Sequence, residues 1–196
     1  MNWAELVDLS GPPAAALAIL VQSAGVPFPG EVLLLAAAAW AATRQQSPAA
    51  LLVLGFLGAV AGSDTGYALA HRGGRPFVEH FGVAFHIRPE RLARAELFFA
   101  RHGDRAILFA RFVVGLRTWA SMLAGMTRMP FLRFQILSAA GDLAWIAAVV
   151  VAGYLVGSNL ALITESPRAI GIGGLVFIVV IVSALLLAQE RAARRR

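Results

Sequence analysis

Long apolar stretches separated by short polar segments dominate the pattern of this 196-residue chain. A helix that crosses a bilayer needs about 20 predominantly apolar residues, and three stretches reach that length. Residues 169–188 carry no charge, whereas residues 49–70 contain Asp64 and residues 134–163 contain Asp142. The pattern predicts that each of these three stretches is a transmembrane helix.

Two further apolar stretches contain residues that a continuous apolar helix does not tolerate. Residues 14–42 are interrupted by two prolines and two glycines within residues 25–30, and each flanking piece is about half a bilayer long at roughly 1.5 Å per residue. Residues 106–125 contain Arg111 and Arg117, which would cost several kcal/mol if they faced lipid. Each stretch is therefore predicted to be a re-entrant hairpin, which enters the membrane and returns on the same side.

The charge distribution orients these elements. Residues 71–105 hold seven arginines and four carboxylates, which predicts an amphipathic cytoplasmic segment, and the tail over residues 191–196 is also basic. Because basic segments stay in the cytoplasm, the C-terminus is predicted to be cytoplasmic and the two hairpins must enter from opposite faces. Each hairpin precedes one full span, as in an inverted-topology repeat. The predicted fold is an all-α polytopic membrane protein with a single domain over residues 1–190, which ends in a C-terminal transmembrane helix.

Composition narrows the functional classes. The chain is 59% hydrophobic and only 14% charged, whereas soluble domains are about a quarter charged, so lipid must cover part of its surface. It has no cysteine, and its four histidines form no metal-binding pattern. Disulfides, thiolate chemistry, a metal site and a bound cofactor are therefore not expected. No nucleophile–base pair is evident either, so the chain is predicted not to be an enzyme.

The basic residues indicate the kind of partner. All seventeen are arginine, and they cluster between the apolar stretches. Anionic lipid headgroups are the simplest partner for such segments, and a nucleic-acid partner is not expected. Arg72 and Arg75 directly follow the first full span, so they are predicted to anchor it at the headgroups. A homo-oligomer is compatible with this pattern.

Charged residues also fall where the two hairpins turn. Glu31 begins the returning half of the first hairpin, where a carboxylate complements the helix dipole, and its alternative role is a simple helix cap. Arg111 and Arg117 flank the break in the second hairpin, and arginine stays charged and binds phosphate bidentately. The functional interpretation is a site for a phosphate headgroup. The alternative is that each arginine only pairs with a buried carboxylate such as Glu31, Asp64 or Asp142.

Asp64 and Asp142 lie just after a glycine in their predicted spans. Their structural role would be to join helices or to pair with an arginine. Intramembrane acids are also the usual proton carriers of transporters. Glu31, Asp64 and Asp142 are therefore the candidate proton-relay or ion-pair residues.

Five motifs in order carry a resemblance to a known family within roughly residues 15–155. They are Pro-Phe-Pro-Gly-Glu at 27–31, Gly-Ser-Asp-Thr-Gly-Tyr at 62–67 with Arg-Gly-Gly-Arg at 72–75, Ala-Arg-Phe at 110–112 with Gly-Leu-Arg at 115–117, Ala-Gly-Met at 124–126 with Met-Pro-Phe at 129–131 and Phe134, and Gly-Asp-Leu-Ala-Trp at 141–145. On these motifs the chain resembles the DedA family of bacterial membrane proteins, part of the wider VTT (SNARE-associated) superfamily.

The resemblance implies two opposed re-entrant hairpins and a role in recycling undecaprenyl phosphate, or other phospholipids, across the bacterial inner membrane. It also implies an essential carboxylate, here Glu31, and two essential arginines, here Arg111 and Arg117. Many family members carry a second acid near the position of Gln22. Because glutamine cannot release a proton, this departure argues against strict two-carboxylate proton coupling.

Together these features predict a flippase for a phosphate-bearing lipid, with a polyprenyl phosphate as a leading substrate. Arg111 and Arg117 would hold the phosphate near the midplane, while Glu31 would compete for them or carry a proton. The alternative function is a proton- or sodium-coupled transporter of a small molecule that supports membrane homeostasis.

Overall fold

The computed structural model describes residues 3–84, 89–102, 105–110 and 116–163, which are helical apart from short turns. In chain order the helices of these ranges are α1 (Trp3–Ser23), α2 (Gly30–Thr43), α3 (Ala49–Ala84), α4 (Pro89–His102), α5 (Arg105–Ala110), α6 (Leu116–Met126) and α7 (Phe131–Ile163). The predicted C-terminal span over residues 169–188 and the basic tail over residues 191–196 lie outside the described residues, and so does Arg111.

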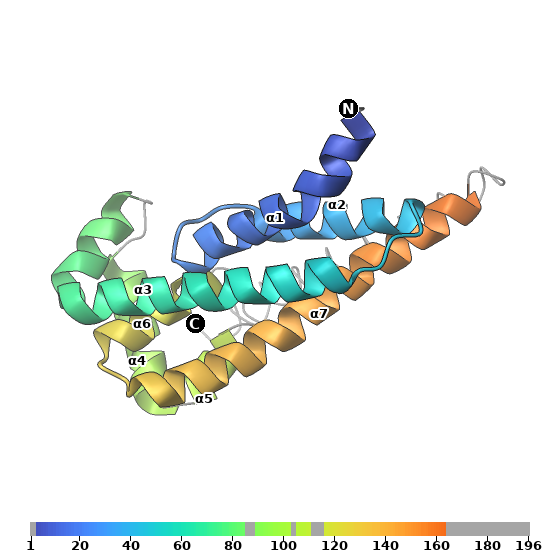
Figure 1. Ribbon diagram of the computed structural model, residues 1–196. Coiled ribbons are helices and arrows are strands. Elements are labelled where there is room, and N and C mark those ends of the chain that lie inside the picture. The colour runs from blue at the N-terminus through green and yellow to red at the C-terminus, as the bar shows by residue number, and fades with distance from the viewer. Residues whose placement is uncertain (1–2, 85–88, 103–104, 111–115, 164–196) are drawn as a thin grey trace.

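Two long helices, α3 and α7, form the axis of the described structure (Figure 1). Both are long and apolar enough to cross a membrane, and they contain the first two predicted spans. They run antiparallel, because Gly55 of α3 lies against Ile146 of α7, whereas Ser63 further along α3 bonds Asp142, which precedes Ile146. The crossing therefore brings polar residues of both helices together inside the bundle.

Helix α3 continues beyond the predicted span and bends. Gly74 has a φ of 63°, a left-handed conformation that glycine adopts without steric cost, and Pro76 begins the next helical turn. Beyond the bend, Arg75 forms ion pairs with Glu79 at 2.7 Å and with Glu96 of α4 at 3.4 Å. The first part of the predicted amphipathic segment is thus the bent end of α3, which is tied to α4.

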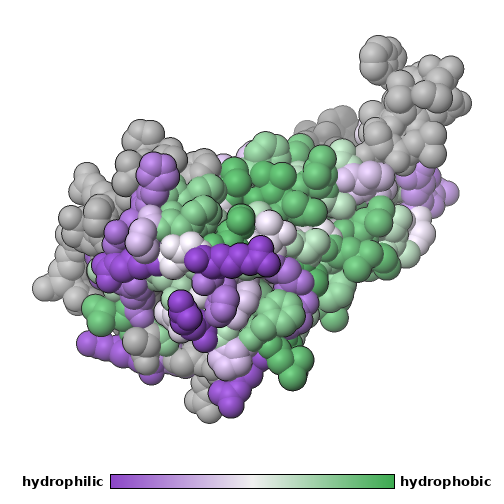
Figure 2. All heavy atoms as spheres, turned by 60° about the vertical axis from the view of Figure 1, so that its left-hand side comes forward, coloured by the Kyte–Doolittle hydropathy of each residue, from purple (hydrophilic) through white to green (hydrophobic). Residues whose placement is uncertain are grey.

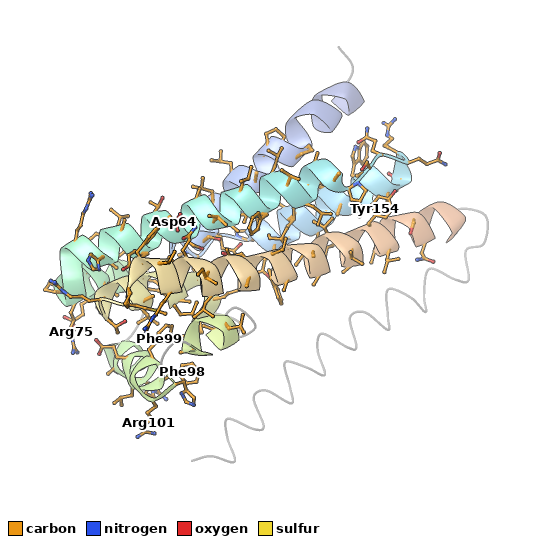
Figure 3. All side chains as sticks on the ribbon, turned by 60° about the horizontal axis from the view of Figure 1, so that its bottom comes forward. Asp64, Arg75, Phe98, Phe99, Arg101 and Tyr154 are labelled. Carbon is orange, nitrogen blue, oxygen red and sulfur yellow. The ribbon has the colours of Figure 1, made fainter. Side chains whose placement is uncertain are left out.

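Helix α4 is amphipathic, as predicted for this part of the chain. Phe99 is buried and Phe98 packs against the same core, whereas Leu97 and Arg101 are exposed. Figure 3 shows Arg101 directed away from the other helices. The apolar side of α4 is therefore covered mainly by the protein's own core.

The first predicted hairpin consists of α1 and α2, and its two limbs pack against different long helices: α1 along α3, and α2 along α7. Glycines of the long helices allow these close approaches, because a Cβ added to any of them would lie 2.1–2.9 Å from a carbonyl oxygen of the facing limb. The facing residues are Gly58 with Ala16, Gly62 with Leu20 and Gly66 with Ala24, and Gly153 with Leu35 and Gly157 with Ala39. In each set of contacts, the residue numbers of the limb rise together with those of the long helix. Each limb therefore runs parallel to its long helix.

Helices α5 and α6 approach from the other end of the bundle. With α4 they gather where α3 finishes and α7 begins (Figure 1). Helix α6 packs along the second half of α3, where a Cβ on Gly125 would meet the Tyr67 carbonyl oxygen at 2.2 Å. Near Gly66 the end of the first limb and α6 come together, since Ala24 and Ser121 both face that glycine. Helix α1 therefore covers the stretch of α3 that precedes Gly66, and α6 covers the stretch that follows it.

The outer surface of the bundle is apolar over most of its length. Large aliphatic side chains are exposed on every long element, among them Leu17, Val32, Val53, Leu57, Ile136, Leu143, Val151 and Leu155. Figure 2 shows hydrophilic residues gathered on the end that it brings forward, whereas hydrophobic residues cover the flank behind it. This distribution suits a bundle whose sides contact lipid and whose end contacts water.

Candidate functional site

The turn of the first hairpin meets α6 near the middle of α3. Gly25, two residues after the end of α1, has a φ of 111°, and a Cβ added there would lie 2.4 Å from Met122 Cε of α6. Beside this contact, Ser121 Oγ donates a hydrogen bond to the Ser23 carbonyl oxygen at 3.0 Å. The turn and α6 are therefore in direct contact inside the bundle.

Glu31 and Arg117 form an ion pair at this meeting point. Glu31 lies in the first turn of α2 and Arg117 is the second residue of α6. Arg117 Nη1 lies 2.8 Å from Glu31 Oε1, and the two side chains are 10% and 34% exposed, respectively. The short distance comes without a well-directed hydrogen bond from Nη1, so the attraction is mainly between charges. The sequence left two roles open for Arg117, binding a phosphate and pairing with a buried carboxylate. The structure shows the pairing, with Glu31 as the carboxylate.

Gln22, in the last turn of α1, is the third member of the site. Its Nε2 donates to Glu31 Oε1 at 2.8 Å, so one carboxylate oxygen is contacted by both Gln22 and Arg117. Gln22 is 7% exposed, and its own Oε1 is buried without a hydrogen-bond partner. From the sequence, Gln22 is notable only because many family members carry an acid near this position. Its contact with Glu31 could not be predicted, because it depends on how the turn brings α1 and α2 together.

Arg117 also contacts the aromatic ring of Trp145 on α7. Its Cζ lies 4.8 Å from the ring centroid, a cation–π geometry that stabilises a poorly solvated guanidinium by about 0.5–2 kcal/mol. Trp145 was not among the predicted site residues, because a tryptophan in an apolar helix has no feature that indicates an arginine partner. The site thus draws on α1, α2, α6 and α7.

A second polar cluster lies at the crossing of α3 and α7. Ser63 Oγ and Ser138 Oγ each donate to Asp142 Oδ2 at 3.3 Å, and all three residues are buried. Asp64 interacts with the Gln135 side chain of α7, and its Oδ1 is buried without a hydrogen-bond partner. Asp142 therefore joins the two long helices, while Asp64 retains an unused acceptor.

The other predicted site residues are placed as follows. Arg72 is exposed just before the bend of α3, and Arg75 is exposed and engaged in its two ion pairs. Figure 3 shows Arg75 at this bend and Asp64 well back along the same helix. Arg111 lies outside the described residues. Within the described ranges, no group of three or more His, Cys, Asp or Glu side chains could hold a metal ion.

Comparisons with known proteins identify a family and several relatives of this chain. A family model for the VTT domain matches residues 28–155. An uncharacterized membrane protein of Synechocystis is 33% identical over 153 residues, which cover 78% of this chain and 70% of the relative. An uncharacterized membrane protein of Mycobacterium tuberculosis is 32% identical over 178 residues, which cover 89% and 81%. Undecaprenyl phosphate transporter A of Bacillus subtilis is 31% identical over 114 residues, which cover 54% and 58%.

No solved structure matches this chain. The segment that the family model matches includes Glu31, Arg117 and the crossing of α3 and α7. The relatives are named as membrane proteins, and two helices here are long and apolar enough to span a bilayer. The chain therefore belongs to the VTT domain family of membrane proteins, which confirms its resemblance to the DedA proteins.

Proposed function

We propose that this protein is a translocase for phosphate-bearing lipids in the bacterial inner membrane, and that it is not an enzyme. The observation that carries the proposal is the ion pair of Glu31 and Arg117 at the meeting point of the hairpin turn and α6. A guanidinium inside an apolar bundle needs a counter-charge. Glu31 provides one that a lipid phosphate can replace.

The geometry of the pair supports such an exchange. Nη1 of Arg117 is close to Glu31 but not well aligned with it, whereas a phosphate can engage a guanidinium through two parallel hydrogen bonds. Glu31 is a third exposed, so water can solvate it when Arg117 turns away. On this proposal Arg117 alternates between Glu31 and the phosphate as the site changes its open side, and Arg111 supplies a second set of donors.

The helix arrangement supports two opposed re-entrant hairpins in an inverted repeat. The apolar part of α1, Gly11–Ser23, and helix α2, Gly30–Thr43, are each about 20 Å long at 1.5 Å per residue, shorter than the hydrocarbon core of a bilayer. Helix α2 runs parallel to α7 along its second half, and α6 has the same relation to α3. In the proposed repeat, α3 and α7 are equivalent spans and α2 and α6 are equivalent returning limbs. The C-terminus would then be cytoplasmic.

The first lipid to test is undecaprenyl phosphate. The Bacillus subtilis relative is named as a transporter of that lipid, and it aligns with about half of this chain. Its headgroup is a phosphate monoester on an apolar chain, which matches a buried arginine beside a lipid-facing surface. Phospholipids carry the same phosphate chemistry and form the second set of substrates to test.

The proposal is tested by lipid transfer in vesicles that contain the purified protein and a fluorescent polyprenyl phosphate. Glu31→Ala, Arg111→Ala and Arg117→Ala should each abolish transfer. Arg44→Ala is the matched control, because Arg44 is an exposed arginine that lies over the Trp40 ring, 5.0 Å from its centroid. Normal transfer by all three site variants would end the proposal.

The proposed topology is tested with single engineered cysteines, because the native chain has none. Thr43→Cys, after α2, should react with an impermeant reagent only from the outside. Met126→Cys, after α6, should react only from the cytoplasm. Labelling of both positions from the same side would exclude opposed hairpins.

A second candidate function, a proton- or sodium-coupled transporter of a small molecule, is favoured by one observation. Asp64 keeps a buried carboxylate oxygen without a hydrogen-bond partner inside the bundle. Proton flux into vesicles distinguishes the two functions. A flux that is independent of added lipid and is lost in Asp64→Asn would favour the small-molecule transporter.

A further inference from the structure

The environment of Gln22 combines close packing with an unused hydrogen-bond acceptor. The side chain fits against the start of α2, where a Cβ on Gly30 would lie 2.7 Å from Gln22 Oε1. That oxygen is buried without a partner, although the whole residue is only 7% exposed. A buried polar group with an unmade hydrogen bond carries a desolvation cost, so an apolar residue would serve packing better. The polar group calls for a role other than packing.

The amide nitrogen indicates that role. Gln22 Nε2 donates to Glu31 Oε1, the same oxygen that Arg117 approaches. Within the described residues, Gln22 donates a hydrogen bond to the Glu31 carboxylate and Arg117 forms an ion pair with it. When Arg117 leaves for a phosphate, Glu31 would be a carboxylate without its ion-pair partner, which water solvates only in part because the side chain is 34% exposed. The Gln22 amide is the donor that remains.

We infer that Gln22 is a positioning residue, which stabilises Glu31 in the state in which Arg117 has passed to the phosphate. This inference rests on the proposed function. A neutral amide suits the role better than a second acid would, because it donates to the carboxylate without adding negative charge near the phosphate. Gln22 thereby sets how readily Arg117 is released, and so the affinity for the lipid, without touching the lipid itself.

The test measures binding of a short-chain polyprenyl phosphate to the purified full-length protein in detergent by calorimetry. Gln22→Met removes the donor but keeps an unbranched side chain of similar size. The hydrogen bond from Gln22 is already present while Arg117 is paired with Glu31, so only the strength that it gains when Arg117 leaves contributes to the affinity. The expected result is a weaker affinity, by a factor of up to about ten. Gln46→Met is the matched control. Gln46 lies in the turn between α2 and α3, so this substitution should leave the affinity unchanged.

A double-mutant cycle separates positioning from a general structural defect. Glu31→Gln removes the charge that competes for Arg117, so it should bind the phosphate more tightly than the wild type. In that background Gln22→Met should have no further effect, because no carboxylate is left to stabilise. An equal loss of affinity in both backgrounds would show that Gln22 acts through packing alone and would overturn the inference.

The remaining outcomes separate the inference from the proposed function. If the wild type binds the lipid and Gln22→Met binds it equally well, the inference is wrong and the proposed function stands. If the wild type does not bind a polyprenyl phosphate or a phospholipid, the proposed function fails, and the inference fails with it. Thermal unfolding of each variant verifies that the compared proteins are folded.

Discussion

Replacing Arg117 with methionine tests whether the Glu31 ion pair stabilises the bundle. Methionine keeps an unbranched apolar side chain and removes the charge, so Glu31 would retain only the Gln22 amide. Removing one partner of a fully buried pair typically costs 3–5 kcal/mol. Because the Glu31 side chain is 34% exposed, water offsets part of that cost. We expect a loss of about 2 kcal/mol in the free energy of unfolding.

The measurement is equilibrium unfolding of the purified protein in mixed micelles of a mild detergent and dodecyl sulfate, followed by helical circular dichroism. A loss of about 2 kcal/mol shifts the unfolding equilibrium roughly 30-fold at 1.4 kcal/mol per factor of ten. Arg44→Met is the control, because it removes a cation–π contact of similar geometry from an exposed site. Its effect should stay within about 0.5 kcal/mol.

The double variant Arg117→Met with Glu31→Gln decides the interpretation. A neutral glutamine at position 31 needs no counter-charge, so the double variant should regain about 1 kcal/mol relative to Arg117→Met alone. It should still fail to transfer lipid, since the guanidinium is absent. If the two substitutions instead destabilise the protein additively, the residues do not interact and the reasoning about the site is refuted.

Three further predictions use the same unfolding assay. Gly62→Leu should cost at least about 2 kcal/mol, because its side chain would meet a carbonyl oxygen of α1 at 2.2 Å, whereas Gly11→Ala, which faces open space, should be nearly neutral. Tyr67→Phe should cost about 1 kcal/mol, because the Tyr67 hydroxyl donates to the Met129 carbonyl oxygen; an unchanged stability would show that this bond contributes nothing. Gly74→Ala should cost about 1–3 kcal/mol, because φ is 63° and ψ is −159° there, a region that is almost restricted to glycine, and no loss would mean that the bend does not require this conformation.

The helical breaks could be predicted from the sequence because their causes are local. Two prolines and two glycines within residues 25–30 prevent one continuous helix, and the turn between α1 and α2 lies there. The apolar runs over residues 49–70 and 134–163 likewise predicted the first part of α3 and most of α7. The bend at Gly74 was not predicted, because the span was expected to end at residue 70. Proline is tolerated in the first turn of a helix, so Pro76 allows a second helical stretch to begin where the first one ends.

The contacts of the site could not be predicted in the same way. Gln22 and Glu31 are joined across a turn, and Arg117 reaches Trp145 on another helix. Such pairs depend on how the helices pack, and residue type alone offers several partners for each charge. Asp142 illustrates this, because its sequence position does not reveal that Ser63 of α3 and Ser138 of α7 both donate to its carboxylate.

The attachment of the two hairpin limbs to different long helices has a mechanical consequence. Helix α1 packs closely against glycines of α3, and α2 packs closely against glycines of α7. Any displacement of α3 along α7 must therefore be taken up by the short connection between the limbs. Gln22 precedes that connection and Glu31 follows it, so the separation of amide and carboxylate reports directly on how far the two halves of the bundle have moved.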